Sequence, residues 1–220
     1  MKRTIHYFGD SHTAGIGNVG APPGCDYVHK PYSEYLTELL DIPYRNYAWG
    51  GKPFMKNVEE FTKYFDTFKK GDIVLFQIQF LCNSILSFEN DRSYIVSAGH
   101  LMDEEERREY GFSMEDSLTL LDWTNKFEER RSIYDLYSVI NLLRYLRTKG
   151  VETHLLYWLK TYTIDLPDNE LLLKFDGVPY VCNGKVPTIK DVTNGIWDDA
   201  HTPNEFNEEL AHKIYNIING

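Results

Sequence analysis

Two short segments near opposite ends of the chain carry residue types suited to acyl-transfer chemistry. Gly9-Asp10-Ser11 follows a short β-rich segment, and a serine on a tight strand-to-helix turn presents both its hydroxyl and its backbone N–H to one small volume. Acyl transfer needs such a nucleophile beside a hydrogen-bond donor for the developing oxyanion. Taken alone, the motif has an alternative interpretation, in which Asp10 or Ser11 only caps the following helix.

A serine nucleophile needs a base, and the candidate lies near the C-terminus. Asp198 and His201 stand three positions apart, just before the last predicted helix. His201 would accept the Ser11 proton as a general base, while Asp198 would orient the imidazole and stabilise its charged form. Asp199 competes for the orienting role, and the motif alone also fits a capping turn or half of a metal site. No other His, Asp or Glu cluster has ligand spacing, so no metal is predicted.

The elements that must position these residues alternate along the chain. Apolar or β-rich segments predict strands at 4–9, 44–48, 72–79 and 153–159, with a short one within 177–181. Apolar residues at helical spacing predict helices at 35–40, 58–68, 133–146 and about 204–218. This alternation predicts an α/β fold with a parallel sheet covered on both faces. Ligands bind such sheets at the carboxyl ends of strands, where Ser11 would lie.

Length and charge limit the remaining possibilities. The 220 residues fit a single domain over 1–220, with the weakly patterned stretch 84–129 interpreted as an insertion that could cap the active site. A net charge of −10 argues against nucleic-acid and membrane partners. Three cysteines form no disulfide or zinc pattern, and neither a signal peptide nor a membrane span is found, so we expect a cytoplasmic protein. The oligomeric state stays open.

Taken together, the motifs resemble those of the SGNH (GDSL-like) hydrolases. Gly9-Asp10-Ser11 looks like the first family block, and Asp198-x-x-His201, followed by Thr202-Pro203-Asn204 and later Ala211, looks like the last. Asn46-Tyr47-Ala48-Trp49-Gly50-Gly51 looks like the second block, and segment 31–40 looks like the helix after the first block. The resemblance spans the whole chain apart from the insertion.

This resemblance implies a fold and a site. The fold would be a three-layer α/β/α sandwich with a central parallel sheet, the flavodoxin-like SGNH hydrolase fold. Ser11, His201 and Asp198 would form the catalytic triad, acting on a carboxylic ester without metal or cofactor. The backbone N–H groups of Ser11 and Gly51 would form the oxyanion hole, with Gly50 as the alternate to Gly51.

One block departs from the family pattern. After a strand such as 72–79 the family has Gly-x-Asn-Asp, whose asparagine is the third oxyanion donor. Here Gln79 stands at the glycine position and Leu81 at the asparagine position, while Asn83 lies two residues later. The third donor is therefore Asn83 on a different loop path, or Gln79. The alternative is that Asn83 caps a helix beginning at Ser84. Loss of one such donor typically costs about 10²–10³ in turnover.

Four further residues are candidate substrate contacts. Trp49 and Trp197 adjoin two catalytic blocks, and Asp10 and His12 flank Ser11. The alternative roles are packing beneath the site for the tryptophans and a surface position for His12. Family habit and the aromatic-rich loops favour a small O-acyl ester, most simply O-acetyl, on a carbohydrate. Two alternatives remain: an O-acyltransferase that uses the same triad to acylate a sugar hydroxyl, and a non-catalytic carbohydrate-binding or scaffolding protein.

Overall fold

The computed structural model describes residues 3–15, 30–49, 52, 54–78, 84–87, 93–96, 104, 107–108, 111–123, 129–157, 172–174 and 204–220. Five segments form one parallel sheet: β1 (Ile5–Phe8), β2 (Tyr44–Asn46), β3 (Ile73–Gln77), β6 (Glu152–Tyr157) and β7 (Leu172–Lys174). Their order is β2-β1-β3-β6-β7, and every neighbouring pair is parallel. The predicted α/β fold with a parallel sheet is confirmed, and the strand order is compatible with a flavodoxin-like arrangement.

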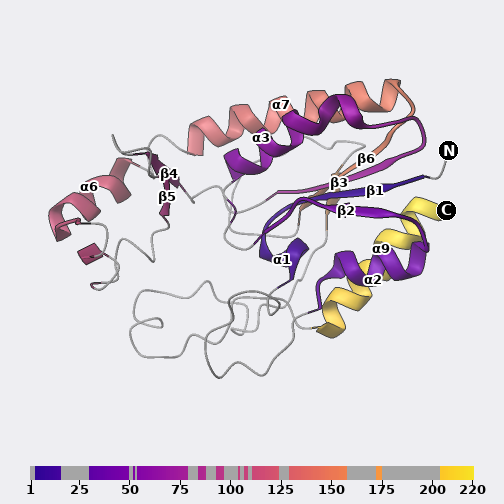
Figure 1. The fold of residues 1–220 in the computed structure, drawn as a ribbon, viewed down its shortest axis with the longest axis horizontal. Helices are drawn as coiled ribbons and strands as arrows, with labels where there is room; N and C mark the ends of the chain where they lie inside the picture. The colour runs from indigo at the N-terminus through magenta and orange to yellow at the C-terminus, as the bar shows by residue number, and fades with distance from the viewer. Residues whose placement is uncertain are drawn as a thin grey trace.

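Helices cover both faces of this sheet (Figure 1). On one face α2 (Tyr32–Leu40) packs against α9 (Asn204–Asn219), and on the other α3 (Phe54–Tyr64) packs against α7 (Glu129–Thr148). All four lie where helical spacing predicts them. α2, α3 and α7 begin about one turn earlier than the spacing predicts, and helix boundaries are the least certain part of such a prediction. Among the described helices, none combines the length and apolar content that a membrane span needs.

Two apolar layers hold the helices to the sheet, because neighbouring residues of a strand point to opposite faces. Ile5 and Tyr7 of β1 belong to the core shared with α2 and α9, whereas Phe8 belongs to the core shared with α3 and α7. The neighbouring strand β3 is buried on both faces along its whole length. The run of apolar residues that predicts this strand therefore reflects a central position in the sheet.

The region 84–129 contains elements that the sequence pattern does not reveal. Ser84 begins a strand, β4 (Ser84–Ser87), which pairs antiparallel with β5 (Ser93–Val96), so the predicted alternative of a helix beginning at Ser84 is wrong. A four-residue apolar segment flanked by serines does not distinguish strand from helix by periodicity, and the cross-strand pairing decides. The hairpin and α6 (Met114–Trp123) lie outside the three layers, on the left of Figure 1. A capping role for this insertion stays a prediction.

The last strand of the sheet also differs from expectation. The pattern predicts a strand within 177–181, which lies outside the described residues, while the observed edge strand is β7 at Leu172–Lys174. With three residues, β7 is too short to show an alternating pattern in the sequence. Its position is set by parallel pairing with β6, from Leu155 opposite Leu172 to Tyr157 opposite Lys174.

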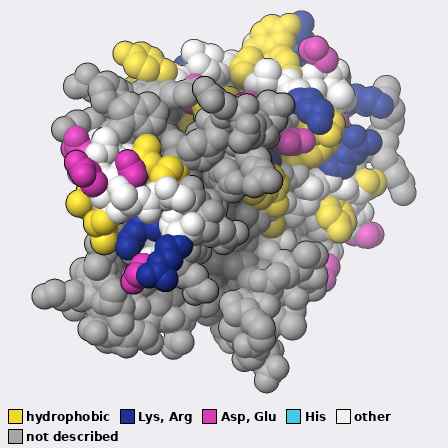
Figure 2. Space-filling view, turned by 60° about the vertical axis from the view of Figure 1, so that its left-hand side comes forward, with side chains coloured by type: hydrophobic (Ala, Val, Ile, Leu, Met, Phe, Trp, Pro, Cys, Tyr) yellow, Lys and Arg dark blue, Asp and Glu magenta, His cyan; other side chains and the backbone are white. Residues whose placement is uncertain are grey.

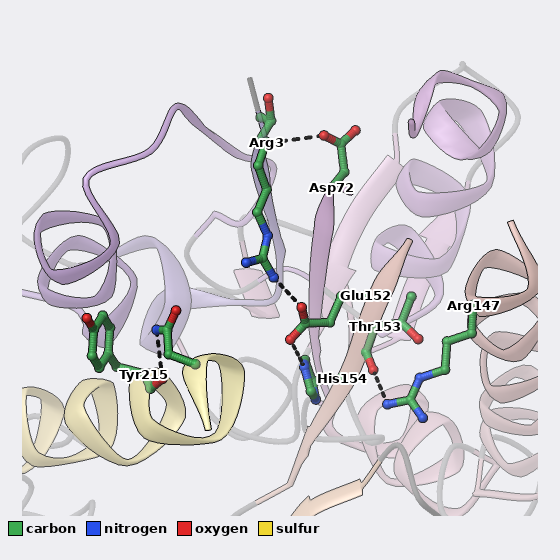
Figure 3. A network of polar contacts seen from close by, with 9 residues as sticks. Arg3, Asp72, Arg147, Glu152, Thr153, His154 and Tyr215 are labelled. Carbon is green, nitrogen blue, oxygen red and sulfur yellow. Dashed lines mark hydrogen bonds and ion pairs between the residues drawn. The ribbon is translucent and has the colours of Figure 1, made fainter. Parts of the chain in front are cut away.

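At the amino edge of the sheet, charged side chains join the starts of three strands (Figure 3). Arg3 forms an ion pair with Glu152, and His154 Nε2 lies 2.9 Å from Glu152 Oε1. Asp72, just before β3, accepts the backbone N–H of Thr4 at 3.1 Å. These contacts link the amino ends of β1, β3 and β6.

Candidate active site

Ser11 lies on the turn that follows β1, at the carboxyl edge of the sheet. It is half-buried and is the first residue of the short helix α1 (Ser11–Ala14). Asp10 is the N-cap, since its Oδ1 accepts the His12 N–H at 3.0 Å and its carbonyl accepts the Ala14 N–H at 2.8 Å. The turn therefore has the predicted strand-to-helix form. The capping interpretation holds for Asp10 and leaves Ser11 as the candidate nucleophile.

A buried polar network lies directly behind this turn. Gln77, the last residue of β3, donates from Nε2 to Asp10 Oδ1 at 2.9 Å. The Thr13 hydroxyl donates to Gln77 Oε1, and the Tyr32 hydroxyl lies 3.1 Å from Thr13 Oγ1. All four residues are buried. The network therefore links the nucleophile turn to the centre of the sheet and to the start of α2.

The direction of these hydrogen bonds follows from Asp10. An ionised carboxylate only accepts, so the amide nitrogen of Gln77 must face it and the amide oxygen must face Thr13. Thr13 then uses its proton on Gln77, which makes Tyr32 the donor to Thr13. Burial raises the pKa of the Tyr32 phenol, so Tyr32 keeps the proton that it donates.

Gly9 makes room for this arrangement. A Cβ atom at Gly9 would lie 2.5 Å from Gln77 Oε1 and 2.7 Å from Thr13 Cβ, closer than van der Waals contact allows. The two side chains therefore meet in the space that a larger residue at Gly9 would occupy. The glycine of the Gly9-Asp10-Ser11 motif is needed here for the close approach of Gln77 and Thr13.

The carbonyl of Thr13 connects the turn to two other segments. It accepts hydrogen bonds from Ser33 Oγ at 2.6 Å and from Asn46 Nδ2 at 3.2 Å. Asn46 ends β2 and begins the segment that resembles the second family block. The nucleophile turn is therefore in direct contact with the segment that resembles the second family block, across 33 positions in the sequence.

A buried lysine directly follows the same segment in the sequence. Lys52 is 1% exposed, and its Nζ donates to the Tyr47 carbonyl at 2.7 Å and lies 5.9 Å from the centre of the Trp49 ring. Burial lowers the pKa of Lys52 to about 8, against the opposing effect of Glu60. Trp49 itself is 40% exposed.

Several predicted site residues lie outside the described residues, and their roles stay predictions. They are Gly50, Gly51, Gln79, Asn83, Trp197, Asp198, Asp199 and His201. Of the predicted substrate contacts, His12 is 3% exposed, so the alternative of a surface histidine is wrong. Asp10 Oδ1 accepts hydrogen bonds from the His12 N–H and from Gln77 Nε2. Contacts of Asp10, His12 and Trp49 with substrate stay predictions.

The start of α9 is nevertheless tied to the corner of the fold that holds Ser11. Asn207, in the first turn of α9, is buried and donates from Nδ2 to the Lys30 carbonyl at 3.0 Å. Lys30 lies two residues before α2, whose first residue, Tyr32, bonds to Thr13 of the nucleophile turn. His201 precedes α9 by three residues in the sequence.

Sequence reasoning named Asp10 but did not predict its buried network with Gln77, Thr13 and Tyr32. A signal existed for Gln77, because it is an uncharged polar residue in the otherwise apolar strand Ile73–Gln77. Such a residue at the carboxyl end of a central strand needs a buried partner. Thr13 and Tyr32 carry no comparable signal, since threonine and tyrosine are ordinary residues of turns and cores.

The described part of the face shown in Figure 2 carries no block of charge of one sign. Acidic, basic and apolar side chains are interspersed there. The exposed apolar residues of α6 include Met114 and Leu118, at 47% and 53% exposure.

Comparison with known proteins finds likenesses among solved structures alone. No protein-family model matches the chain, and no curated protein matches it. Among the solved structures that it resembles is an acetyl xylan esterase, Est2A, from the rumen bacterium Butyrivibrio proteoclasticus, with a TM-score of 0.48 and 12% sequence identity. The match covers 98% of this chain and 63% of that chain, so this chain spans less than two thirds of the esterase. A likeness at this level carries no argument about activity.

Proposed function

We propose that this protein is a serine esterase of the SGNH type, which hydrolyses a small O-acyl ester, most simply an O-acetyl ester on a carbohydrate. The observation that carries the proposal is the position of Ser11. It is half-buried at the carboxyl end of β1, which lies between β2 and β3 in a parallel sheet. Ligands bind α/β sheets at this edge, and the Asp10 cap holds the turn in place.

In the proposed reaction Ser11 Oγ attacks the ester carbonyl while His201 accepts the hydroxyl proton. Asp198 orients the imidazole and stabilises its charged form. His201 then donates this proton to the leaving alcohol as the carbon–oxygen ester bond breaks. Water, activated by the same imidazole, hydrolyses the acyl-enzyme and releases the carboxylic acid. The side chains supply all the proton transfers, so the reaction class requires neither metal nor cofactor.

The negative charge on the tetrahedral intermediate is held by backbone donors in this proposal. The N–H groups of Ser11 and Gly51 would point at the oxyanion, with Asn83 or Gln79 as a third donor. The contact of Asn46 with the Thr13 carbonyl supports the proposal, because it anchors the segment that leads to Gly51 against the nucleophile turn.

Support for His201 comes from the chain that follows it. Three residues span at most about 11 Å, and α9 begins three residues after His201. The Asn207 bond to Lys30 ties the first turn of α9 to the start of α2, next to Thr13. A histidine in this part of the sequence is therefore a reasonable partner for Ser11.

The proposal is tested with para-nitrophenyl acetate and a fluorophosphonate probe. Wild-type protein should hydrolyse the ester and be labelled on Ser11. Ser11→Ala should lower turnover by about 10³-fold or more and abolish labelling. The matched control is Ser138→Ala, because Ser138 is exposed on α7 and its hydroxyl donates to the Tyr134 carbonyl one turn earlier in the same helix.

Two outcomes would replace this function with another. Folded wild-type protein that is neither labelled nor active would favour the non-catalytic carbohydrate-binding alternative. Acyl-sugar as the dominant product, when water and a sugar acceptor compete, would favour the O-acyltransferase. The measurement is the mass of the product formed from an acetyl donor in the presence of the sugar.

A further inference from the structure

We propose that Gln77 is a positioning residue for the reaction, which holds the Ser11 turn in its reactive geometry by binding it on both sides of the nucleophile. The inference rests on the proposed function, because it takes Ser11 as the nucleophile. Gln77 contacts Asp10, the residue before Ser11, and Thr13, two residues after it. One side-chain amide therefore spans the nucleophile.

Gln77 is anchored in the centre of the sheet. It ends β3, whose neighbours in the sheet are β1 and β6, and it pairs with Leu156 of β6. On the other side, Phe8 pairs with Phe76, so the Gln77 side chain stands next to Gly9 at the point where β1 turns into α1. Its amide is 0% exposed, so solvent does not compete for its hydrogen bonds.

The amide group is chemically suited to this task. It donates from Nε2 to Asp10 Oδ1 at 2.9 Å and accepts the Thr13 hydroxyl proton at Oε1. An apolar side chain would do neither, and an ionised carboxyl group would accept from Thr13 but repel Asp10. A strand interior would otherwise favour an apolar residue, since a buried amide is tolerated only when its hydrogen bonds are made.

The bond to Asp10 bears on the nucleophile through the backbone. Asp10 Oδ1 accepts from both Gln77 Nε2 and the His12 N–H, so it fixes the peptide group that joins Ser11 to His12. Without Gln77, the buried Asp10 carboxylate loses one of its donors and is expected to move toward other donors or water. A shift of about 1 Å at the reacting atoms can cost about 10²-fold in rate.

The first test compares Gln77→Leu with a control that removes a different buried hydrogen bond. Tyr7→Phe deletes the 3.0 Å bond between the Tyr7 and Thr37 hydroxyls, which also joins β1 to α2 but does not touch the nucleophile turn. Each variant is measured for thermal stability, for the rate of Ser11 labelling by fluorophosphonate, and for kcat and KM on para-nitrophenyl acetate.

Gln77→Leu should lower kcat and the labelling rate by about 10–10²-fold with KM within about threefold of wild type. Tyr7→Phe should lower the melting temperature and leave both rates within about twofold. Wild-type rates in Gln77→Leu would overturn the inference while the proposed function stands. Equal rate losses in both variants would also overturn it, because the effect would then follow stability. An unreactive wild-type protein would overturn both the inference and the proposed function.

A second variant keeps the inference testable if Gln77→Leu fails to fold. Gln77→Glu has nearly the same shape, and its carboxyl group can share one proton with Asp10 at low pH. The rate ratio of wild type to Gln77→Glu should then be large at pH 8 and fall toward pH 5, as the shared proton restores a donor to Asp10. A ratio that does not change with pH would overturn the inference.

Groups that titrate in both proteins affect both rates alike, so their effect cancels in the ratio of the wild-type rate to the Gln77→Glu rate. Tyr32, which faces Gln77 through Thr13, stays protonated over this range because burial raises its pKa. The imidazoles of His12, in the same turn, and of His201 are present in both proteins. A pH-dependent ratio therefore reports the introduced carboxyl group and its neighbour Asp10.

Discussion

At the carboxyl edge of the sheet the polar network beside Ser11 is buried and mostly neutral, whereas at the amino edge the ion pair of Arg3 with Glu152 is charged and partly exposed. Asp10, Thr13 and Gln77 are at most 6% exposed, and their bonds end on a single carboxylate. At the other edge, Arg3 and Glu152 pair with side-chain exposures of 35% and 32%. The two edges of one sheet therefore carry two different kinds of polar structure.

The difference matters because the two kinds of contact respond differently to change. A buried network without solvent access loses a specific geometry when one member is removed, since nothing replaces the missing bond. A half-exposed ion pair is screened by salt, and water takes the place of a lost partner, so it contributes about 1 kcal/mol or less. The carboxyl edge is thus suited to hold reacting groups, and the amino edge to hold strand ends together.

The largest effect on turnover is expected from the proposed base, His201, which we assign to the carboxyl edge. His201→Ala should lower esterase turnover by about 10³-fold or more with little change in stability, because the imidazole carries the proton in both steps. Asp198→Ala should cost less than His201→Ala, and the matched control Asp199→Ala should cost little. Steady-state kinetics on para-nitrophenyl acetate measures all three. If Asp199→Ala has the larger effect, the orienting role belongs to Asp199.

The next largest effects are expected from one glycine at each edge. Replacing Gly9 should affect both labelling rate and stability, whereas replacing Gly150 should affect stability alone. Gly9→Ala should destabilise the fold by about 1–3 kcal/mol and slow Ser11 labelling more than tenfold, because its Cβ would collide with Gln77 and Thr13. Gly150, at the amino edge, has φ of 79°, so Gly150→Ala should cost about 1–2 kcal/mol through backbone strain.

Denaturant unfolding and probe labelling of both glycine variants separate the two edges. Gly150→Ala should keep its labelling rate, because Lys70, the side chain nearest to its new Cβ, lies far from Ser11 in the fold, before β3. A Gly150→Ala variant that loses reactivity as strongly as Gly9→Ala would break the distinction between the edges.

The smallest effect concerns the pH dependence of stability at the amino edge. Burial by itself raises the pKa of Glu152. The His154 hydrogen bond and the nearby charges of Arg3 and Arg147 lower the pKa by more than burial raises it, so the pKa in the folded protein lies below its usual value. The stabilisation is therefore fully present above about pH 4.5 and is lost as pH falls through the folded-state pKa. Glu152→Gln should flatten this loss.

The measurement is the free energy of unfolding between pH 6 and pH 3, with Glu208→Gln, an exposed change on α9, as control. His6 adds a separate loss below about pH 6.5, because burial lowers the pKa of its imidazole, and this loss is common to all three proteins. The expected difference is about 1 kcal/mol or less, and esterase activity at neutral pH should not change. If the unfolding free energy of Glu152→Gln depends on pH as it does in wild type, Glu152 does not contribute to the pH dependence of stability.

The sequence predicted the layered sheet better than its details. The apolar run of β3 and the helical stripes of α7 and α9 are long enough to be recognised locally. The hairpin β4–β5 and the strand β7 were not recognised, because three or four residues carry no reliable period and depend on their partner strands. The prediction of one domain over 1–220 stays a prediction.

In the candidate site, too, the sequence predicts some residues and not the contacts between distant ones. Ser11 could be placed on a strand-to-helix turn from the glycine, the short β segment before it and the helix signals after it. His201 and Asp198 were predicted from motif order and stay predictions. Gln77 could be seen as an unusual residue in an apolar strand, but its partner Asp10 lies 67 positions away in the sequence. No local pattern connects residues so far apart.

The amino-acid sequence by itself determined the alternation of strands and helices and the position of Ser11 at the end of the first strand, because these follow from periodicity and turn residues that act over a few positions. Only the tertiary structure decided that Gln77, Thr13 and Asp10 meet over Gly9. Parallel pairing of β1 with β3 brings these residues together, and burial makes each bond depend on the others.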